Sequence, residues 1–265
     1  MSEMRNELTL QRVVVAIEPR NLSTQSLAAA LELAQSLQLE LAGLFVEDRN
    51  LLRLAALPIT REVGAVSGAV REIEVGGIER ALRVQAEQMR GALARFAGEL
   101  DLPWSFRVER GELLERVLAQ LSETVAVFFA PVPRKAQIAK PAHTGPAMPV
   151  PRKALAVVDP TPAGSRALSV AQRLSLAPGS TLAVASVKTQ KVVPGAIQEM
   201  SKSSPTASNR THAVRLENTG IDALVNAVRI TACDILVLGS GVFPRQQSAF
   251  RALLERARCL VVLVG

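Results

Sequence analysis

The sequence predicts an α/β protein in which two copies of an open, parallel sheet follow one another along the chain. Three observations carry this prediction: short apolar runs, amphipathic stretches after them, and a constant spacing between corresponding positions of the two halves. Parallel strands buried on both faces are nearly continuous runs of Val, Ile, Leu and Ala, whereas helices that cover them have apolar residues three and four positions apart. A chain of 265 residues has room for two such units.

Each half opens with an apolar run that leads into a helical pattern. The runs occupy residues 12–17 and 153–158. The apolar residues at helical spacing that follow are Leu27, Ala30, Leu31, Ala34 and Leu37 in the first half and Ala167, Leu168, Ala171 and Leu174 in the second. Both halves therefore begin with a buried strand and an amphipathic helix.

Corresponding positions of the two halves keep one register over about 30 residues, as expected of an internal repeat. Each pair is separated by 141 positions (159 − 18), and several pairs are identical. The pairs include Glu18 with Asp159, Pro19 with Pro160, Leu27 with Leu168, Leu41 with Leu182, and Val46 with Val187. A single ungapped register with identities indicates a duplication.

Later in each half the spacing changes to 109 positions (220 − 111), which leaves the second copy 32 residues shorter (141 − 109). The first copy has a long amphipathic pattern over residues 76–100, whereas the matching residues 189–211 are polar and predict a loop. The second copy alone ends with a helix and a strand at residues 259–264, and residues 147–150 are at best a vestige of that strand in the first copy. We expect domains over residues 1–131 and 153–265, joined by a basic, Pro-rich linker over 132–152.

Composition and charge exclude several classes of function. No apolar run approaches the roughly 20 residues of a membrane helix, and we expect a cytoplasmic protein without a membrane span. Two cysteines and two histidines provide neither a disulfide framework nor a metal site.

The net charge is +7, and five basic residues fall in 131–153: Arg134, Lys135, Lys140, Arg152 and Lys153. No aromatic residue interleaves with them, which favours a solvated linker over a nucleic-acid platform.

Open parallel sheets bind ligands beyond the carboxyl ends of their strands. In the second half these ends carry Asp159 with Pro160, Val187 with Lys188, and residues 239–242. In the first half they carry Glu18 with Pro19, residues 45–48, and Ala130 with Pro131. We expect any small ligand to lie at these positions.

Three segments of the second half carry a resemblance to a known family. They are Asp-Pro-Thr-Pro-Ala-Gly-Ser-Arg-Ala-Leu at 159–168, Cys-Asp-Ile-Leu-Val-Leu-Gly-Ser-Gly at 233–241, and Leu-Leu-Glu-Arg-Ala-Arg-Cys-Leu-Val-Val-Leu-Val at 253–264. With them the chain resembles the universal stress protein family in its tandem, two-domain form. The resemblance implies Rossmann-like domains of the adenine-nucleotide alpha hydrolase-like type. The polar segment 189–211 predicts that the second domain lacks the long second helix.

Nucleotide-binding members of the family have the pattern G-x2-G-x9-G-(S/T), in which glycines let the backbone approach a triphosphate at a helix N-terminus. The resemblance matches Asp159 to the family's acid and Gly239 to its first glycine. Val242 stands at the second glycine and Gln247 at the third, and Ser248 follows Gly239 by nine positions (248 − 239), where the family has 14. The candidate cofactor-binding residues are Asp159, Pro160, Val187, Gly239, Ser240, Gly241 and Ser248.

Each of these residues also has a purely structural interpretation. Asp159 before a proline is a strand-end turn residue, residues 239–241 form a turn that needs positive φ, and Ser248 is an N-cap. Residues 45–58 form a packing helix or, alternatively, line a pocket as a lid. The two cysteines are buried small residues.

Our leading hypothesis is a non-catalytic, universal-stress-type binding module for stress response or regulation, with a degraded nucleotide site. It acts through a small ligand or a protein partner, and a homodimer is the simplest such partner. We find no catalytic constellation, so whether the protein is an enzyme stays open, with a negative answer favoured. The rival hypothesis is an ATP- or AMP-binding sensor or slow ATPase that uses the second domain. A basic adaptor for nucleic acid or membrane is a third class.

Overall fold

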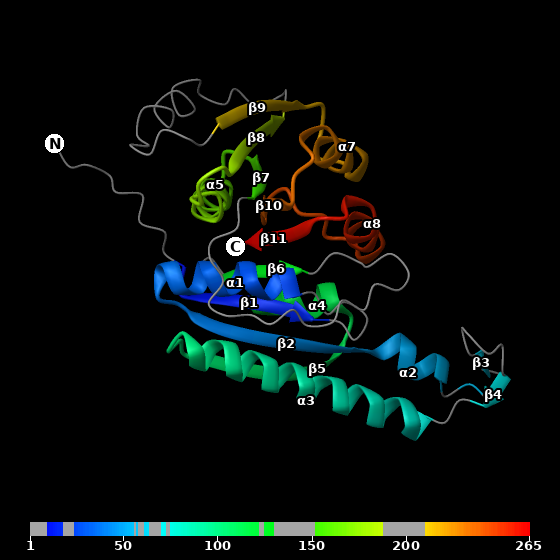
Figure 1. Cartoon of the computed structure of the whole chain (residues 1–265). Coiled ribbons are helices and arrows are strands. Elements are labelled where there is room, and N and C mark those ends of the chain that lie inside the picture. Colours follow the sequence, from blue (N-terminus) through cyan, green and yellow to red (C-terminus); the bar gives the residue numbers. More distant parts are fainter. Residues whose placement is uncertain are drawn as a thin grey trace.

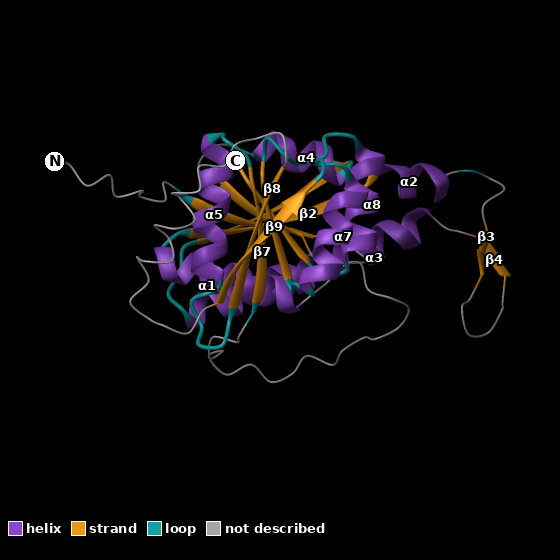
Figure 2. Cartoon of the chain, turned by 90° about the horizontal axis from the view of Figure 1, so that it is seen from above, coloured by secondary structure: helices purple, strands orange, loops and turns teal. Residues whose placement is uncertain are grey.

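The computed structural model describes residues 10–17, 24–55, 57, 61–63, 70–72, 75–121, 125–129, 152–187 and 210–265. In this part of the chain, nine strands form one twisted sheet with helices on both faces, and the α/β class is confirmed (Figure 1). Figure 2 looks onto the fan of strands from above, with helices along its two sides.

The first half contains β1 (Arg12–Ile17), α1 (Thr24–Leu37), β2 (Glu40–Asp48), α2 (Arg49–Ala55), β3 (Arg61–Val63), β4 (Val70–Glu72), α3 (Val75–Glu99), β5 (Trp104–Gly111), α4 (Leu113–Gln120) and β6 (Val125–Phe129). The second half contains β7 (Lys153–Val158), α5 (Pro162–Leu174), β8 (Thr181–Val187), β9 (Arg210–Leu216), α7 (Ile221–Thr231), β10 (Ile235–Gly239), α8 (Gln247–Ala257) and β11 (Leu260–Val264). The short strands β3 and β4 pair with each other, apart from the large sheet.

The strand order of the large sheet is β5-β2-β1-β6-β11-β10-β7-β8-β9. In each half the first four of these strands follow the same spatial order of third, second, first and fourth. Neighbouring strands within a half are parallel, whereas β6 and β11 are antiparallel. At this junction Phe129 pairs with Val261 and Ala126 pairs with Val264. The last strand, β11, therefore joins the strands of the two halves into one sheet.

The apolar side chains of the central strands alternate between two cores because successive residues of a strand point to opposite faces. In β1, Val13 and Val15 lie in the core that α1, α3 and α5 cover, and Val14 lies in the core that α4, α7 and α8 cover. Every described residue of the central strand β11 is fully buried. Burial on both faces explains why the central strands read as continuous apolar runs.

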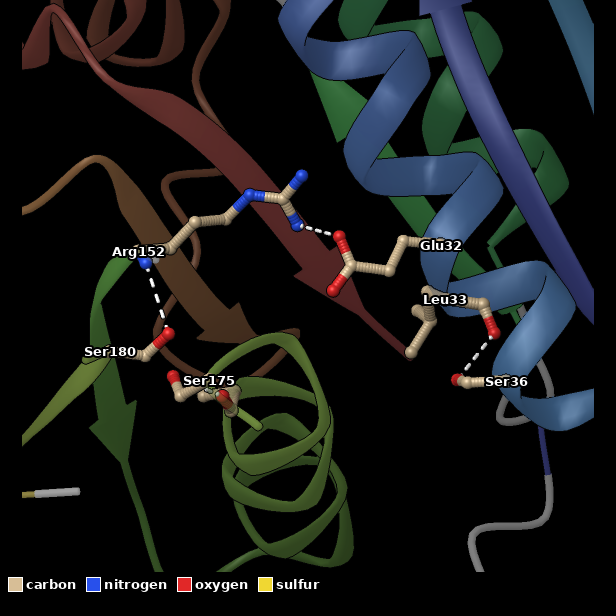
Figure 3. Close-up of polar contacts among 7 residues, drawn as sticks. Glu32, Leu33, Ser36, Arg152, Ser175 and Ser180 are labelled. Atoms are coloured by element: carbon tan, nitrogen blue, oxygen red, sulfur yellow. Dashed lines mark hydrogen bonds and ion pairs between the residues drawn. The ribbon is translucent and has the colours of Figure 1, made fainter. Parts of the chain in front are cut away.

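On the α1 side, the two halves are joined by an ion pair between Arg152 and Glu32 (Figure 3). Arg152 precedes β7, and its guanidinium reaches across to Glu32 in α1. The backbone N–H of Arg152 donates a 3.0 Å hydrogen bond to the hydroxyl of Ser180. The Arg152 side chain is 9% exposed and that of Glu32 is 27% exposed. The prediction that Arg152 belongs to a solvated basic linker is therefore wrong, because this charge is buried and paired.

Several sequence expectations can be compared with the described elements. The long amphipathic pattern of residues 76–100 is helix α3, and the segment 45–58 contains a short helix, α2, that contacts α3. The edge strands β5 and β9 were not predicted, and β9 includes residues 210 and 211 of the expected loop. The remainder of that loop, including the expected loss of the long helix from the second copy, lies outside the described residues. So do residues 130–151, with most of the linker and the expected vestigial strand.

Loss of the long helix from the second copy would uncover one face of its sheet, and the sequence predicts that the first copy, the segment 189–211 or a second chain covers that face. On β8 it is covered, because Leu182 and Val184 are 5% and 4% exposed. On the neighbouring strand β9, Ala213 pairs with Val184 and points to the same face, yet Ala213 is exposed. The covered part of this face therefore ends at β8.

We predict that Glu32→Ala destabilises the protein by about 2 kcal/mol, because it leaves the buried Arg152 guanidinium without its counter-charge. The free energy of unfolding would be measured by urea denaturation. The matched control is Asp222→Ala, which removes the exposed partner of Arg256 and should change stability by less than about 0.5 kcal/mol. Equal losses in the two variants would contradict a structural role for the Arg152–Glu32 pair.

Candidate functional site

The carboxyl ends of the parallel strands β7 and β10 lie side by side, and the predicted site residues gather there. Asp159 directly follows β7, and Gly239 is the last residue of β10. Because β6 and β11 are antiparallel, the carboxyl ends of the first half point to the opposite edge of the sheet. The carboxyl ends of the described strands of the two halves therefore lie at opposite edges of the sheet.

The carboxylate of Asp159 is used within its own turn. Its Oδ1 accepts hydrogen bonds from the backbone N–H of Thr161 at 3.2 Å and from the Thr161 hydroxyl at 2.5 Å. The same hydroxyl oxygen accepts a 3.2 Å bond from the backbone N–H of Gly164 and so caps helix α5. Pro162 at the first helical position is already fixed in a helical φ. Asp159 therefore organises the start of α5, in agreement with its interpretation as a strand-end turn residue.

Two glycines of the predicted site are required by close packing. A Cβ added at Gly241 would lie 2.2 Å from Oδ2 of Asp159, and one at Gly239 would lie 2.9 Å from the backbone N of Gly164. Among the described glycines, Gly179 alone has a positive φ. The prediction that residues 239–241 need positive φ is therefore wrong. Gly241 instead leaves room for the carboxylate of Asp159, and Gly239 leaves room for the start of α5.

The turn after β10 folds back into the core. The backbone N–H of Val242 donates a 3.1 Å bond to the carbonyl of Gly239, and that of Ser240 donates a 2.8 Å bond to the carbonyl of Val264. The side chains of Val242 and Phe243 are buried, at 6% and 4% exposure. The turn is held on one side by β11 and on the other by the core beneath α8.

Phe243 belongs to an aromatic cluster that links the two halves. Its ring centroid lies 6.2 Å from that of Phe129 in β6 and 5.1 Å from that of Phe250 in α8. Phe129 and Phe250 are 5.0 Å apart in an edge-to-face arrangement. Aromatic pairs at these distances are favourable beyond their burial. The turn after β10 therefore packs against the first half.

The other predicted residues are Pro160, Val187 and Ser248, and of these Ser248 alone is near the turn in sequence. Pro160 is exposed beside Asp159, and the backbone of Val187 ends β8 opposite Leu216. Ser248 is exposed in the first turn of α8, and the buried pair Val242 and Phe243 stands between it and Gly241 in the chain. The N-cap of α8 is Gln246, so the interpretation of Ser248 as an N-cap is wrong.

In the first half, Glu18, Pro19, Ala130 and Pro131 lie outside the described residues. At the end of β2, Glu47 is 8% exposed as a residue and accepts a 2.7 Å hydrogen bond from Arg110. This bond raises the pKa of the Arg110 guanidinium. Asp48 accepts a 2.8 Å bond from the backbone N–H of Asn50 and lies 3.7 Å from the guanidinium of Arg251 in α8. Both acids are thus paired within the fold.

Sequence reasoning missed the arginine partners Arg110 and Arg251. Arg110 lies on an unpredicted edge strand, and Arg251 lies on the polar face of the last helix of the other half. The alternation of polar and apolar residues could have predicted that each arginine lies at a surface. It could not have predicted that they face Glu47 and Asp48.

A hollow of about 620 Å³ lies at the outer end of the sheet, between β9 and α7. Its lining includes Arg215, Leu216, Asn218, Asp222, Asn226 and Ile230. None of the predicted site residues belongs to this described lining. The hollow and the Asp159 turn are therefore separate features.

The chain can be compared with solved structures once this geometry is known. A universal stress protein from Archaeoglobus fulgidus DSM 4304 superposes with a TM-score of 0.52 over 97% of this chain and 97% of that chain, at 11% sequence identity. The fold is that of a universal stress protein. No protein-family model and no curated protein sequence matches the chain.

Two further solved structures cover similar shares at lower similarity. One, described as a universal stress protein of Pseudomonas aeruginosa UCBPP-PA14, has a TM-score of 0.42 and 14% identity over 98% of this chain and 95% of that chain. The other is the cytoplasmic domain of a prokaryotic cation chloride cotransporter, with a TM-score of 0.41 and 8% identity over 96% and 94%.

Among the described residues, no helix is long and apolar enough to cross a membrane. The same residues contain no group of three or more His, Cys, Asp or Glu side chains that could hold a metal ion.

We predict that Gly241→Ala lowers the free energy of unfolding by about 1–3 kcal/mol, because the new methyl group meets a carboxylate that Thr161 holds in place. In an Asp159→Ala background the same substitution should cost less than about 0.5 kcal/mol. Urea denaturation of the wild type, both single variants and the double variant measures this coupling. Equal costs of Gly241→Ala in the two backgrounds would show that Asp159 does not fill this space.

Proposed function

We propose that the chain is a non-catalytic universal-stress-type protein that serves stress response or regulation by binding a partner or a small ligand. The universal-stress fold supports the class of protein. We propose that this ligand is not a nucleotide. The burial of Val242 and Phe243 in the turn after β10 is the observation that supports this point. In this fold that turn is where a nucleotide-binding member would cradle phosphates.

A phosphate cradle needs backbone N–H groups that point to the ligand and glycines that let it approach. Here the N–H groups of Ser240 and Val242 are bonded to carbonyl oxygens of the chain itself. Oδ1 of Asp159 accepts two bonds from Thr161, and Oδ2 faces Gly241. These contacts use the groups that a nucleotide would need, and they support a degraded nucleotide site.

The chemistry at this edge supports binding over catalysis. General acid–base catalysis needs a titratable side chain that can exchange a proton with the reacting group within hydrogen-bond reach. The predicted residues at this edge supply one carboxylate, Asp159, already engaged by Thr161. We therefore infer a binding module.

We also infer that the two halves arose by duplication and act as one unit. The support is the common spatial order of their first four strands and the register of 141 positions. The binding partner that we propose is a second copy of the chain or another protein, and the proposed location is the cytoplasm.

One observation favours a second candidate function, a sensor or slow hydrolase of ATP or AMP. Asp159, Gly239 and Gly241, separated by about 80 residues in sequence, do meet at one turn. This is the side of the fold on which the family resemblance places the nucleotide. Val187 ends β8 at the same edge, because Ser186 pairs with Val158 directly before Asp159.

We predict that the wild-type protein shows no micromolar binding of labelled ATP or AMP in equilibrium dialysis with magnesium, and that Asp159→Ala changes nothing. The reason is that the turn is filled by Val242 and Phe243 and its N–H groups are bonded. The matched control is Asp222→Ala, which removes an exposed acid from α7 in the same half. Micromolar binding that Asp159→Ala abolishes and Asp222→Ala preserves would overturn the proposal in favour of the nucleotide sensor.

A further inference from the structure

The two cysteines of the chain lie on neighbouring strands of the sheet. Cys233 precedes β10 and Cys259 precedes β11, and Ile235 pairs with Leu260 in the parallel register of these strands. The pairing extends one residue before the strands, because the N–H of Leu260 donates a 2.9 Å bond to the carbonyl of Asp234. Residues 233 and 259 are therefore diagonal neighbours, 26 positions apart in sequence (259 − 233).

Both thiols point into the same core. Cys233 and Cys259 belong to the cluster of buried residues under α7 and α8, and they are 7% and 4% exposed. Each thiol shifts the pKa of the other through a hydrogen-bond interaction, as expected of side chains that lie close together. Neighbouring strands lie about 4.8 Å apart with a rise of about 3.3 Å per residue, which places a diagonal pair of Cα atoms within the range of disulfides.

The two thiols are chemically unequal. The hydrogen bond from Cys259 lowers the pKa of Cys233 and outweighs burial, which raises it. The same contact with Cys233, together with burial, raises the pKa of Cys259. Cys233 is therefore the thiol that reaches the reactive, thiolate form first.

The surroundings of Cys233 give a small oxidant a route to the pair. Its neighbours Ala232 and Asp234 are both exposed, and the turn between α7 and β10 lies at the surface. Hydrogen peroxide is close to water in size. To reach the Cys233 thiol, a molecule of this size needs to pass only the residues of this turn.

We propose that Cys233 and Cys259 are a site of reversible oxidation, at which hydrogen peroxide converts the two thiols into an intramolecular disulfide. The Cys233 thiolate attacks one oxygen of the peroxide, the O–O bond breaks, and Cys233 becomes a sulfenic acid while the leaving hydroxide takes up the proton that Cys233 released. The Cys259 sulfur then attacks the sulfenic sulfur and the S–O bond breaks. The departing hydroxide takes the Cys259 proton, so two thiols and one peroxide yield one disulfide and two waters.

The cross-link acts on the strand that both halves share. It joins the start of β10 to the start of β11, and β11 pairs with β6 of the first half. Oxidation therefore closes a covalent loop that contains α8 and the turn with Phe243. A loop of this length removes conformational freedom from the unfolded chain and stabilises the folded one.

The experiment uses the full chain, reduced, freed of reductant and treated with hydrogen peroxide. We expect the intact mass to fall by two hydrogen atoms, maleimide labelling of the denatured protein to be lost, and a peptide that links residues 233 and 259 to appear after digestion. Dithiothreitol should reverse all three changes. Because the chain has two cysteines, the mass and the peptide identify the pair. The oxidised protein should unfold at a temperature higher by roughly 5–10 °C.

Two variants assign the order of the steps. In Cys259→Ser, Cys233 should stop at the sulfenic acid and be trapped by dimedone. In Cys233→Ser, dimedone labelling of Cys259 should be at least tenfold slower. Maleimide labelling of both cysteines that persists at peroxide concentrations that oxidise glutathione, or a cross-link between two chains, would overturn the proposal. Faster trapping of Cys259 would overturn the order of attack.

Discussion

The antiparallel pairing of β6 with β11 is the contact on which the rest of the molecule depends. β11 hydrogen-bonds to β10 on one side and to β6 on the other, and its residues are buried on both faces. Without this contact, each half would present an open edge of apolar strand to water, with unpaired backbone groups along it. The Arg152–Glu32 pair supports the junction on one face, and the Phe129–Phe243–Phe250 cluster supports it on the other.

The same junction also shapes the candidate site. Because it reverses the direction of the strands, the carboxyl edges of the two halves face away from each other. Phe129 of the first half packs against Phe243, which is buried in the core, so the turn after β10 lies against the junction. The structural role of this turn and the proposed loss of nucleotide binding thus have one physical cause. A side chain that stabilises the junction occupies the segment from which phosphate contacts would come.

Much of the fold could be predicted from the sequence because the central strands are buried on both faces. The runs at residues 12–17 and 153–158 are continuous and apolar, and both are strands at those positions. The edge strands β5 and β9 escaped prediction because half of their side chains face solvent: Trp104 and Val108 are exposed, as is His212. The sequence assigned Arg152 to a solvated linker for a related reason. Its sequence neighbours are linker-like, and its partner Glu32 lies 120 positions away.

The position of the candidate site could be predicted from the sequence. The packing of side chains that fills its turn could not. Asp159 and Gly239 could be placed together because strands that open and close a parallel unit end at one edge. The reason for Gly241 could not be seen, since it depends on the side-chain oxygen of a residue about 80 positions earlier. The filling of the turn by Phe243 depends on Phe129, and nothing in the local pattern of residues 239–248 indicates that contact.

The position of β11 has a consequence for folding during synthesis. Domains generally fold as they emerge from the ribosome, the N-terminal one first. Here β1, β2, β5 and β6 emerge long before β11, so the apolar edge of β6 stays without its native neighbour while more than a hundred further residues are made, up to residue 260. Until then β6 can pair with β1 on one side, and its other edge is open to a wrong strand or a chaperone. The central place of the last strand therefore couples the solubility of the nascent first half to the completion of the second.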